Sequence, residues 1–237
     1  MAFNREVFIK RAVTAFFFVA VMLIGLLWNE GSFLALVLLI HAGCWFEYEK
    51  IVSGFQKPLR YILFGVIYLS LSWALFLDLH VSFPFYPTSA TATPAIAWFP
   101  LFAIACMWIN DTMAYIVGSL IGRTPFSPIS PKKTWEGTLG GIALTVAVAG
   151  WGSSLLFAKL APAGCIGPLE NIHWYMLALL AAVAGTAGDL LESKFKRMAG
   201  IKDSGNILPG HGGYLDRFDS LLLATPVLWI YLRVVVF

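Results

Sequence analysis

Residues 193–219 read SKFKRMAGIKDSGNILPGHGGYLDRFD, a polar segment that leads from one apolar stretch, 174–190, into another, 218–236. Charged residues make up only 12% of the whole chain, and this segment holds a large share of them. Each flanking stretch has the length that a membrane-spanning helix needs, about 20 residues for a hydrocarbon core of roughly 30 Å. The contrast predicts a membrane protein that holds a charged, functional loop at the membrane surface.

The composition of the rest of the chain supports this interpretation. Hydrophobic residues make up 59% of the 237 residues, and the mean hydropathy is +0.79. A soluble domain of this composition would have too few polar groups to hydrate its surface. We therefore expect an all-α, polytopic bundle of about seven transmembrane helices. The expected spans are 12–28, 32–46, 61–77, 98–121, 137–157, 174–190 and 218–236.

The chain offers no hydrophilic block large enough for a separate soluble domain. Residues 1–97 are expected to supply N-terminal spans and an outward interfacial loop, and residues 98–237 the catalytic part of one continuous membrane unit. The second span is short and joined to the first only by Asn29-Glu30-Gly31, which indicates a tight helical hairpin.

Basic residues are distributed unevenly between the expected loops. Of the 16 Lys and Arg residues, 14 fall at the N-terminus and in the second, fourth and sixth loops, and the exceptions are Lys159 and Arg233. By the positive-inside rule these four segments face the cytoplasm, so the N-terminus is expected inside and the C-terminus outside. The net charge of +3 therefore hides a strongly polarised distribution.

An acidic residue, Asp111, lies next to Asn110 in the middle of the expected span 98–121. A carboxylate at that depth costs roughly 2.5–3.5 kcal/mol on insertion scales, so it should face protein, water or a cation. Two interpretations remain open: a structural polar contact between helices, or a metal or substrate contact in a cavity that opens to the cytoplasm.

The fourth loop, 118–137, reads GSLIGRTPFSPISPKKTWEG. Lys132, Lys133 and Thr134 precede a helix expected to begin near Gly137. A helix N-terminus with adjacent lysines is a good phosphate site. The order of the lysines and the glycine spacing do not match a Walker A loop, which argues against a P-loop NTPase. Two lysines beside a membrane can also serve only to orient the chain.

The sixth loop offers paired carboxylates. If the helix continues past Asp189, then Asp189, Ser193 and Lys196 share one face, and Asp216 and Asp219 share a face at the start of the last span. Two carboxylates from separate helices can hold a hard divalent cation, whose other positions are left to water and phosphate oxygens. The alternative is a set of salt bridges among the acids and bases of the loop.

The motifs of the second half of the chain resemble those of the phosphatidate cytidylyltransferases, also called CDP-diacylglycerol synthases. The resemblance covers roughly residues 98–237, whereas the N-terminal spans are similar only in hydrophobicity. It rests on Asn110-Asp111, on Ser130-Pro131-Lys132-Lys133-Thr134-Trp135-Glu136-Gly137, on Ser193-x-Phe195-Lys196-Arg197, on Lys202-Asp203, on Pro209-Gly210-His211-Gly212-Gly213 and on Asp216-Arg217-Phe218-Asp219.

The resemblance implies a reaction of CTP with phosphatidate that gives CDP-diacylglycerol and pyrophosphate. A phosphate oxygen of phosphatidate attacks the α-phosphorus of CTP, so no side-chain nucleophile is needed. Catalysis is then mainly electrostatic and positional. The implied cofactor is Mg²⁺ with Asp189 and Asp216 as its ligands, and a second cation is compatible with the site.

The implied site residues divide into two groups. The expected catalytic residues are Asp189, Lys196, Arg197, His211, Asp216 and Arg217. The expected substrate-binding residues are Asn110, Asp111, Lys132, Lys133, Thr134, Glu136, Ser193, Lys202, Asp203, Gly212, Gly213 and Asp219. In this interpretation the basic residues neutralise phosphates, the two glycines permit close backbone approach, and His211 orients a phosphate or a water.

The expected partners are CTP, phosphatidate and the phospholipid bilayer, with no nucleic acid, and a homodimer is compatible with the chain. The expected location is a bacterial inner (plasma) membrane, with the active site facing the cytoplasm. One alternative is a CDP-alcohol phosphatidyltransferase, whose acidic pattern DGxxAR…GxxxDxxxD is not found here. Another is an ion-coupled transporter built around Asp111 and Asp189, which would have little use for the charged sixth loop.

The expected sidedness can be tested by cysteine labelling. We expect Lys132, Lys196, Asp203 and His211 on the cytoplasmic side. After the three native cysteines are replaced, a cysteine at position 203 should not react with a membrane-impermeant maleimide on intact cells. It should react once the cells are permeabilised, whereas a cysteine at position 159 should react in both cases. Strong labelling of position 203 from outside would overturn the topology.

Overall fold

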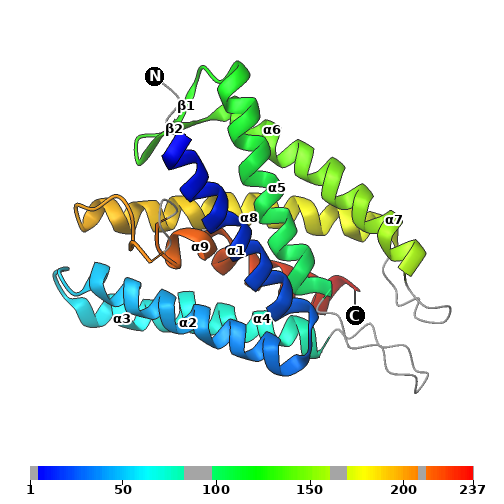
Figure 1. Ribbon diagram of the computed structural model, residues 1–237, viewed down its shortest axis with the longest axis horizontal. Coiled ribbons are helices and arrows are strands. Elements are labelled where there is room, and N and C mark those ends of the chain that lie inside the picture. The colour runs from blue at the N-terminus through cyan, green and yellow to red at the C-terminus, as the bar shows by residue number, and fades with distance from the viewer. Residues whose placement is uncertain (1–4, 83–97, 161–169, 208–211, 237) are drawn as a thin grey trace.

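The structure is a computed structural model that describes residues 5–82, 98–160, 170–207 and 212–236. These residues form a bundle of helices with a small β-hairpin, which confirms the predicted polytopic helical fold (Figure 1). The helices are α1 (Arg5–Leu27), α2 (Glu30–Val52), α3 (Pro58–Gly65), α4 (Ser72–Val81), α5 (Trp98–Ile121), α6 (Trp135–Thr145), α7 (Trp151–Leu160), α8 (Asn171–Met198) and α9 (Leu215–Tyr231). Three π-helical segments continue α3, α6 and α9, namely η1 (Val66–Leu71), η2 (Val146–Gly150) and η3 (Leu232–Val236).

Six helical stretches in the described residues are long and apolar enough to cross a membrane, and α1 adds a shorter apolar stretch, Val13–Leu27. The six are Glu30–Val52, Pro58–Val81, Trp98–Ile121, Trp135–Leu155, Asn171–Met198 and Leu215–Val236. The expected span 98–121 coincides with α5, and each of the other expected spans lies mainly within one of these stretches or α1. The direction in which the chain crosses the membrane stays a prediction.

The helix α2 is longer than the expected span 32–46. It begins with a capping box, in which the Ser32 backbone N–H donates to Asn29 Oδ1 at 2.8 Å and the Asn29 N–H donates to Ser32 Oγ at 3.0 Å. At its other end it continues past position 46, because Glu47 and Tyr48 are buried inside the protein. Polar residues there mark a contact with the protein interior and not the end of the helix.

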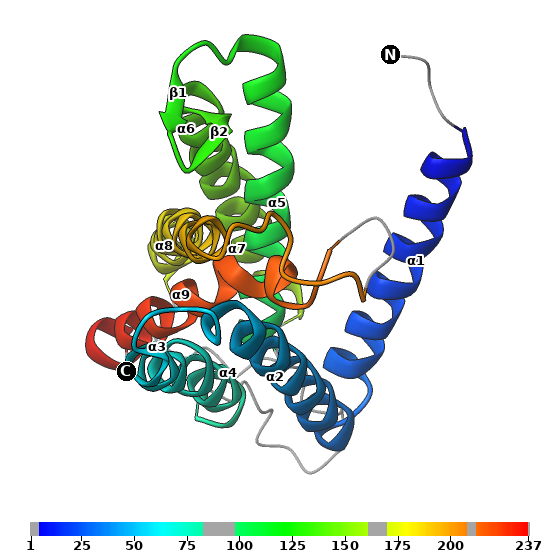
Figure 2. The same ribbon diagram turned by 90° about the vertical axis from the view of Figure 1, so that its left-hand side faces the viewer.

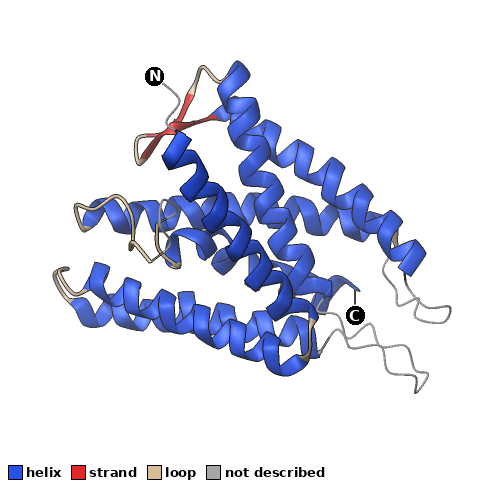
Figure 3. Cartoon of the chain, in the orientation of Figure 1, coloured by secondary structure: helices blue, strands red, loops and turns tan. Residues whose placement is uncertain are grey.

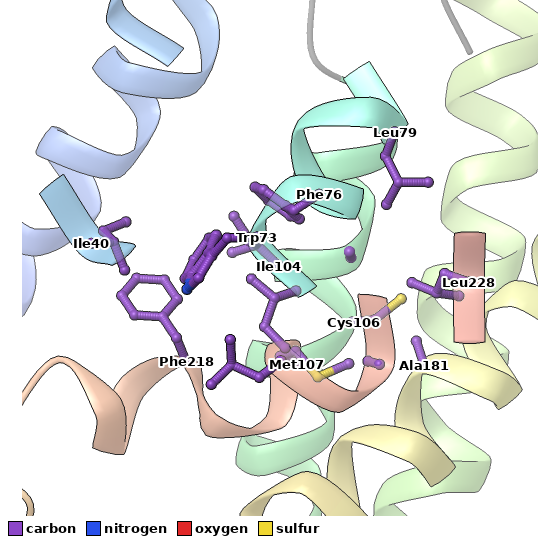
Figure 4. Packing of buried hydrophobic residues seen from close by; sticks show 14 of the residues in the cluster. Ile40, Trp73, Phe76, Leu79, Ile104, Cys106, Met107, Ala181, Phe218 and Leu228 are labelled. Atoms are coloured by element: carbon purple, nitrogen blue, oxygen red, sulfur yellow. The ribbon is translucent and has the colours of Figure 1, made fainter. Parts of the chain in front are cut away.

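A single hydrophobic core joins the two halves of the chain. Phe218 of α9 packs on Trp73 of α4, with ring centroids 5.6 Å apart, and Met107 and Cys106 of α5 lie in the same cluster (Figure 4). The backbones of α8 and α9 approach closely, because a side chain at Gly188 would collide with the Asp219 carbonyl. Small residues give membrane helices this kind of close contact.

The helices α5 and α6 are also in close contact. A Cβ atom at Gly141 would lie 2.7 Å from Ala114 Cβ, and one at Gly137 would lie 2.9 Å from Gly118 Cα. The absence of side chains at these glycines lets α6 lie directly against α5. As a result, the first turn of α6 is placed beside the polar residues of α5.

Residues 125–134 form a β-hairpin that the sequence analysis did not predict. The strands β1 (Pro125–Ser127) and β2 (Ser130–Thr134) are antiparallel, with Ser127 opposite Ser130 (Figure 3). Proline suits this place because both strands are edges, which need not donate every backbone hydrogen bond. The hairpin leads directly into α6 and brings its lysines against the helix bundle.

The first helix lies to one side of the other helices (Figure 2). It packs chiefly against α2, and Phe18 reaches the rings of Phe218 and Trp108 at centroid distances of 6.1 and 6.2 Å. Many of its apolar side chains are exposed, as expected for a helix that faces lipid.

Candidate active site

A cavity of about 430 Å³ lies between α5, α6, α8 and the strand β2. Its lining is polar for a membrane protein and includes several residues that the sequence analysis singled out, namely Asn110, Asp111, Lys132, Lys133, Thr134 and Asp189. The size falls within the roughly 300–1,000 Å³ of typical small-ligand sites. The fold thus gathers the fourth loop, the fifth helix and the end of α8 around one space.

An ion pair between Lys133 and Asp189 crosses this cavity. Both side chains are partly exposed, at 29% and 23% of their surface, so they remain accessible to a ligand. Ser193 Oγ donates a hydrogen bond to Asp189 Oδ1 at 3.3 Å, one turn further along α8. The predicted shared face of Asp189 and Ser193 is therefore confirmed.

Asn110 has a buried acceptor atom without a hydrogen-bond partner among the described residues. Its Nδ2 donates to Thr186 Oγ1 at 3.5 Å, and Thr186 donates in turn to the Ala182 carbonyl at 2.9 Å. Its Oδ1 is buried and has no hydrogen-bond partner among the described residues. A buried acceptor of this kind is costly unless a donor or a cation satisfies it. Asp111, the next residue, is exposed at the cavity.

The N-terminus of α6 opens onto the same cavity. Thr134 is its N-cap, and its Oγ1 accepts a hydrogen bond from the Gly137 N–H at 3.1 Å. Glu136 has a supporting position: its carboxylate accepts hydrogen bonds from the Arg123 N–H at 3.1 Å and from Thr124 Oγ1 at 2.8 Å. Glu136 thus attaches the base of the hairpin to α6, and it is not among the residues that line the cavity.

A second polar cluster forms around Asp216, the first acidic residue of α9. Lys196 Nζ lies 2.7 Å from Asp216 Oδ1 and 2.5 Å from Glu192 Oε2. The Asp216 carboxylate also accepts the backbone N–H groups of Ser204, at 3.0 Å, and Gly213, at 2.8 Å. One lysine therefore offsets two carboxylates, and the Asp216 oxygens are occupied by partners within the chain. Asp189 lines the first cavity, whereas Asp216 lines a second, smaller one.

Gly212 is required by the geometry of this cluster. Its φ of +84° belongs to the left-handed region that favours glycine, and a side chain there would also approach Asp216 Oδ2. The neighbouring residue, His211, lies outside the described residues.

The charged residue that the sequence analysis did not identify is Glu47 of α2. Its side chain is 1% exposed, and its carboxylate accepts hydrogen bonds from Ser204 Oγ at 2.7 Å, Tyr214 N at 3.0 Å and Leu215 N at 2.9 Å. The contact fixes the sixth loop to a helix more than 150 positions away in the chain. Glu47 lies just past the expected span 32–46, so the argument that a carboxylate in a span needs a partner inside the protein was applied only to Asp111.

The remaining predicted residues occupy different places. Arg197 donates to the backbone carbonyls of Ile129 and Ile201, so it joins α8 to the hairpin. Asp219 is buried, and its Oδ1 accepts the Ser220 N–H at 2.6 Å. Arg197 is exposed, as are the predicted residues Asp111, Lys132, Lys202, Asp203 and Arg217.

A smaller cavity of about 180 Å³ adjoins the first and is lined in part by Asp111, Asp216 and Arg217. Asp111 lines both cavities. Among the described residues, the Arg217 side chain has no hydrogen bond or ion pair, so its charge is available to a ligand.

Comparison with known proteins connects this arrangement with one group of sequences. The model of the cytidylyltransferase family matches residues 71–235. A phosphatidate cytidylyltransferase from Rickettsia bellii is 30% identical over 223 residues, which cover 92% of this chain and 88% of that protein. One from Staphylococcus haemolyticus is 35% identical over 229 residues, covering 89% and 82%. One from Synechocystis sp. is 44% identical over 131 residues, which span 55% of this chain and less than half, 42%, of the relative.

The role of Glu47 can be tested without reference to activity. A Glu47→Gln substitution keeps the size of the side chain but places an amide NH₂ group near the N–H donors of Tyr214 and Leu215. We expect the free energy of unfolding to fall by about 1–3 kcal/mol, the usual cost of an unsatisfied buried donor. We also expect faster trypsin cleavage at Lys202, because the loop loses its anchor. Thermal unfolding and cleavage time courses in detergent measure the two effects.

Glu49 is exposed on the same helix, so Glu49→Gln is the matched control and should change neither quantity. Unchanged unfolding and cleavage in Glu47→Gln would contradict the anchoring role.

Proposed function

Because the chain belongs to the cytidylyltransferase family, we propose that it transfers the cytidylyl group of CTP to phosphatidate, which gives CDP-diacylglycerol and pyrophosphate. The observation that carries this proposal is the polar cavity itself. Lys133, Asp111 and Asp189 line it together, beside the N-terminus of α6. Such a site suits a polyanion that must meet a membrane lipid.

The reaction needs no side-chain nucleophile from the protein. A phosphate oxygen of phosphatidate attacks the α-phosphorus of CTP, and the new O–P bond forms as the bond to the β-phosphate oxygen breaks. Pyrophosphate leaves with the electron pair of that bond. Since the attacking phosphate is already anionic, no base has to remove a proton first. The protein must align two polyanions and offset their repulsion.

The residues of the cavity suit this task. The positive end of the α6 helix dipole and the ammonium groups of Lys132 and Lys133 would bind the triphosphate. Lys133 is already held in place by Asp189, so little conformational freedom is lost when a phosphate binds. Arg217 lies beyond Asp111, in the smaller cavity, where its guanidinium would bind a second phosphate through two parallel hydrogen bonds.

The donor atoms of the cavity fit a hard divalent cation. Asp111 and Asp189 offer carboxylate oxygens, and Asn110 offers the amide oxygen that has no partner among the described residues. All-oxygen donor sets suit Mg²⁺, which usually takes its remaining ligands from phosphate and water. In the described part of the chain, no three His, Cys, Asp or Glu side chains gather as a complete metal site. Bound there, Mg²⁺ would offset negative charge on the phosphates.

Asp216 remains a predicted ligand of the cation. Its oxygens already accept hydrogen bonds from Lys196, Ser204 and Gly213, which is the pattern of a residue that orders a loop. The proposed site therefore relies on Asp111 and Asp189. The proposed location is a bacterial inner membrane, with the cavity facing the cytoplasm, where CTP is present.

The proposed activity predicts a defined product. Purified protein in detergent should convert phosphatidate and labelled CTP to CDP-diacylglycerol with release of one pyrophosphate, and EDTA should stop the reaction until Mg²⁺ is restored. Thin-layer chromatography and a pyrophosphate assay follow both products. A folded protein that forms neither product with Mg²⁺ present would overturn the proposal. Turnover that persists in EDTA would contradict only the proposed requirement for a divalent cation.

The role of Lys133 separates phosphate binding from simple orientation of the loop. Lys133→Gln should lower kcat/KM for CTP by roughly 10- to 150-fold, because one hydrogen bond to a charged group contributes about 1.5–3 kcal/mol. Lys133→Arg should recover only part of the loss, because a planar guanidinium does not replace a compact ammonium. Steady-state kinetics at saturating phosphatidate measure the effect.

Lys194 is exposed on α8 and lies outside the cavity lining, so Lys194→Gln is the control for a general loss of positive charge. Equal kinetics for Lys133→Gln and Lys194→Gln would leave Lys133 with a topological role only.

A further inference from the structure

An apolar groove of about 450 Å³ lies between α1 and α2. Its walls are formed by side chains of α1 on one side and of α2 on the other, including Phe17, Val21, Leu36 and Leu39, and Tyr214 lies at the start of α9. Figure 2 shows that α1 and α2 diverge from the turn that joins them. The groove belongs to the membrane-spanning part of the chain, because Val13–Leu27 and Glu30–Val52 are both apolar stretches.

The surroundings decide what kind of molecule fills this groove. Water in this groove would lose hydrogen bonds, since the apolar walls offer almost no hydrogen-bond partners. In a bilayer the available molecules are lipids, whose acyl chains match the apolar lining. The occupant is therefore an acyl chain, and the question is which lipid it belongs to.

The groove adjoins the smaller of the two polar cavities. Thr14 and Phe18 line both the groove and the 180 Å³ cavity. That cavity also holds Arg217, whose side chain has no partner among the described residues, and Asp111, which in turn lines the 430 Å³ cavity. A lipid in the groove would thus have its anionic headgroup beside an available cation and next to the proposed CTP site.

The length and direction of the groove fit a lipid of one leaflet. From Thr14 to Met22 the helix α1 advances by about 12 Å, at 1.5 Å per residue. Half of a hydrocarbon core of roughly 30 Å is about 15 Å. Thr14 is at the polar end, and Met22 lies eight residues further along α1, towards the α1–α2 turn. An acyl chain would therefore run from the membrane surface towards the bilayer centre.

We propose that the α1–α2 groove binds one acyl chain of the phosphatidate substrate and thereby positions its phosphate at Arg217, beside Asp111. This inference rests on the proposed function, whose lipid substrate it takes as given. It makes the groove the part of the enzyme that senses acyl-chain length, since a short chain would leave the end near Met22 unfilled.

Filling the groove tests this assignment. Val21 lines it and is 51% exposed, so Val21→Trp adds bulk to the wall without disturbing the core. We expect the KM for dioleoyl phosphatidate to rise by roughly tenfold, the lower limit for a change of one methylene in an apolar pocket. The KM for dioctanoyl phosphatidate and that for CTP should stay within about twofold of wild type. Kinetics in mixed micelles at fixed detergent-to-lipid ratio measure these constants.

Matched controls come from the same two helices. Ile24 is 54% exposed on α1 and lies outside the groove lining, so Ile24→Trp should behave as wild type with both lipids. From the opposite wall, Leu39→Trp should reproduce the chain-length effect, whereas Leu38→Trp, which is exposed but outside the lining, should not. If Val21→Trp fails to fold, the Leu39→Trp and Leu38→Trp pair decides the matter.

The outcomes separate the two proposals. Wild-type protein that forms no CDP-diacylglycerol from either lipid contradicts the proposed function. Active wild type, together with groove variants that resemble their controls, shows that the groove holds only bulk lipid and overturns this inference. An equal rise in KM for both lipids also overturns it, because a site for the distal part of a chain must distinguish their lengths.

Discussion

The carboxylate of Glu47 is the contact on which the polar part of this structure depends. It lies inside α2 and binds one hydroxyl and two backbone N–H groups of the sixth loop and the first turn of α9. In a membrane protein these N–H groups need an acceptor, because the surrounding hydrocarbon offers none. A single acidic side chain thereby fixes the start of α9, and with it the position of Asp216 and Arg217.

Charge compensation extends this principle along α8. Asp189 pairs with Lys133 from the hairpin, and one and two turns further on Glu192 and Lys196 pair with each other and with Asp216. Removal of one member of an ion pair would leave the other as an uncompensated buried or half-buried charge. This costs more free energy than the pair itself contributes. The charged residues Asp189, Glu192 and Lys196 of α8 therefore bind both the hairpin and the start of α9. The helix α8 thus positions the hairpin and the start of α9, and it also supplies Asp189 to the cavity.

The sequence was sufficient to predict the helices and the charged segments, because length, hydropathy and the distribution of basic residues are local properties. It was also sufficient for neighbours one turn apart, such as Asp189 with Ser193. It could not show which carboxylates face the same space. That depends on how α5, α8 and α9 pack against each other, which is not a local property. The shared cation of Asp189 and Asp216 stays a prediction: Asp189 lines the larger cavity and Asp216 the smaller one.

Long-range partners were beyond prediction for the same reason. The hydrogen bond between Glu47 and Ser204 joins residues 157 positions apart, and no local pattern encodes it. The β-hairpin was hidden by its prolines, which normally argue against strands but are tolerated in an isolated pair with two open edges. Asp111 was identified by its cost in the membrane, whereas Glu47 was missed because the expected span 32–46 ended just before it.

In the proposed reaction, the position of Asp111 suits a site that must serve two substrates of opposite character. It is the residue common to the cavity that suits a water-soluble triphosphate and the cavity that leads to the apolar groove. A nucleotide arrives from water and a lipid from the side of the membrane, so the reacting phosphates have to meet where the two routes join. Two polyanions repel each other there, and a carboxylate alone would increase the repulsion. Lys133 lines the larger cavity and Arg217 the smaller one, each together with Asp111, so their positive charges would offset this repulsion. The proposed cation, with Asp111 as a ligand, would offset it further.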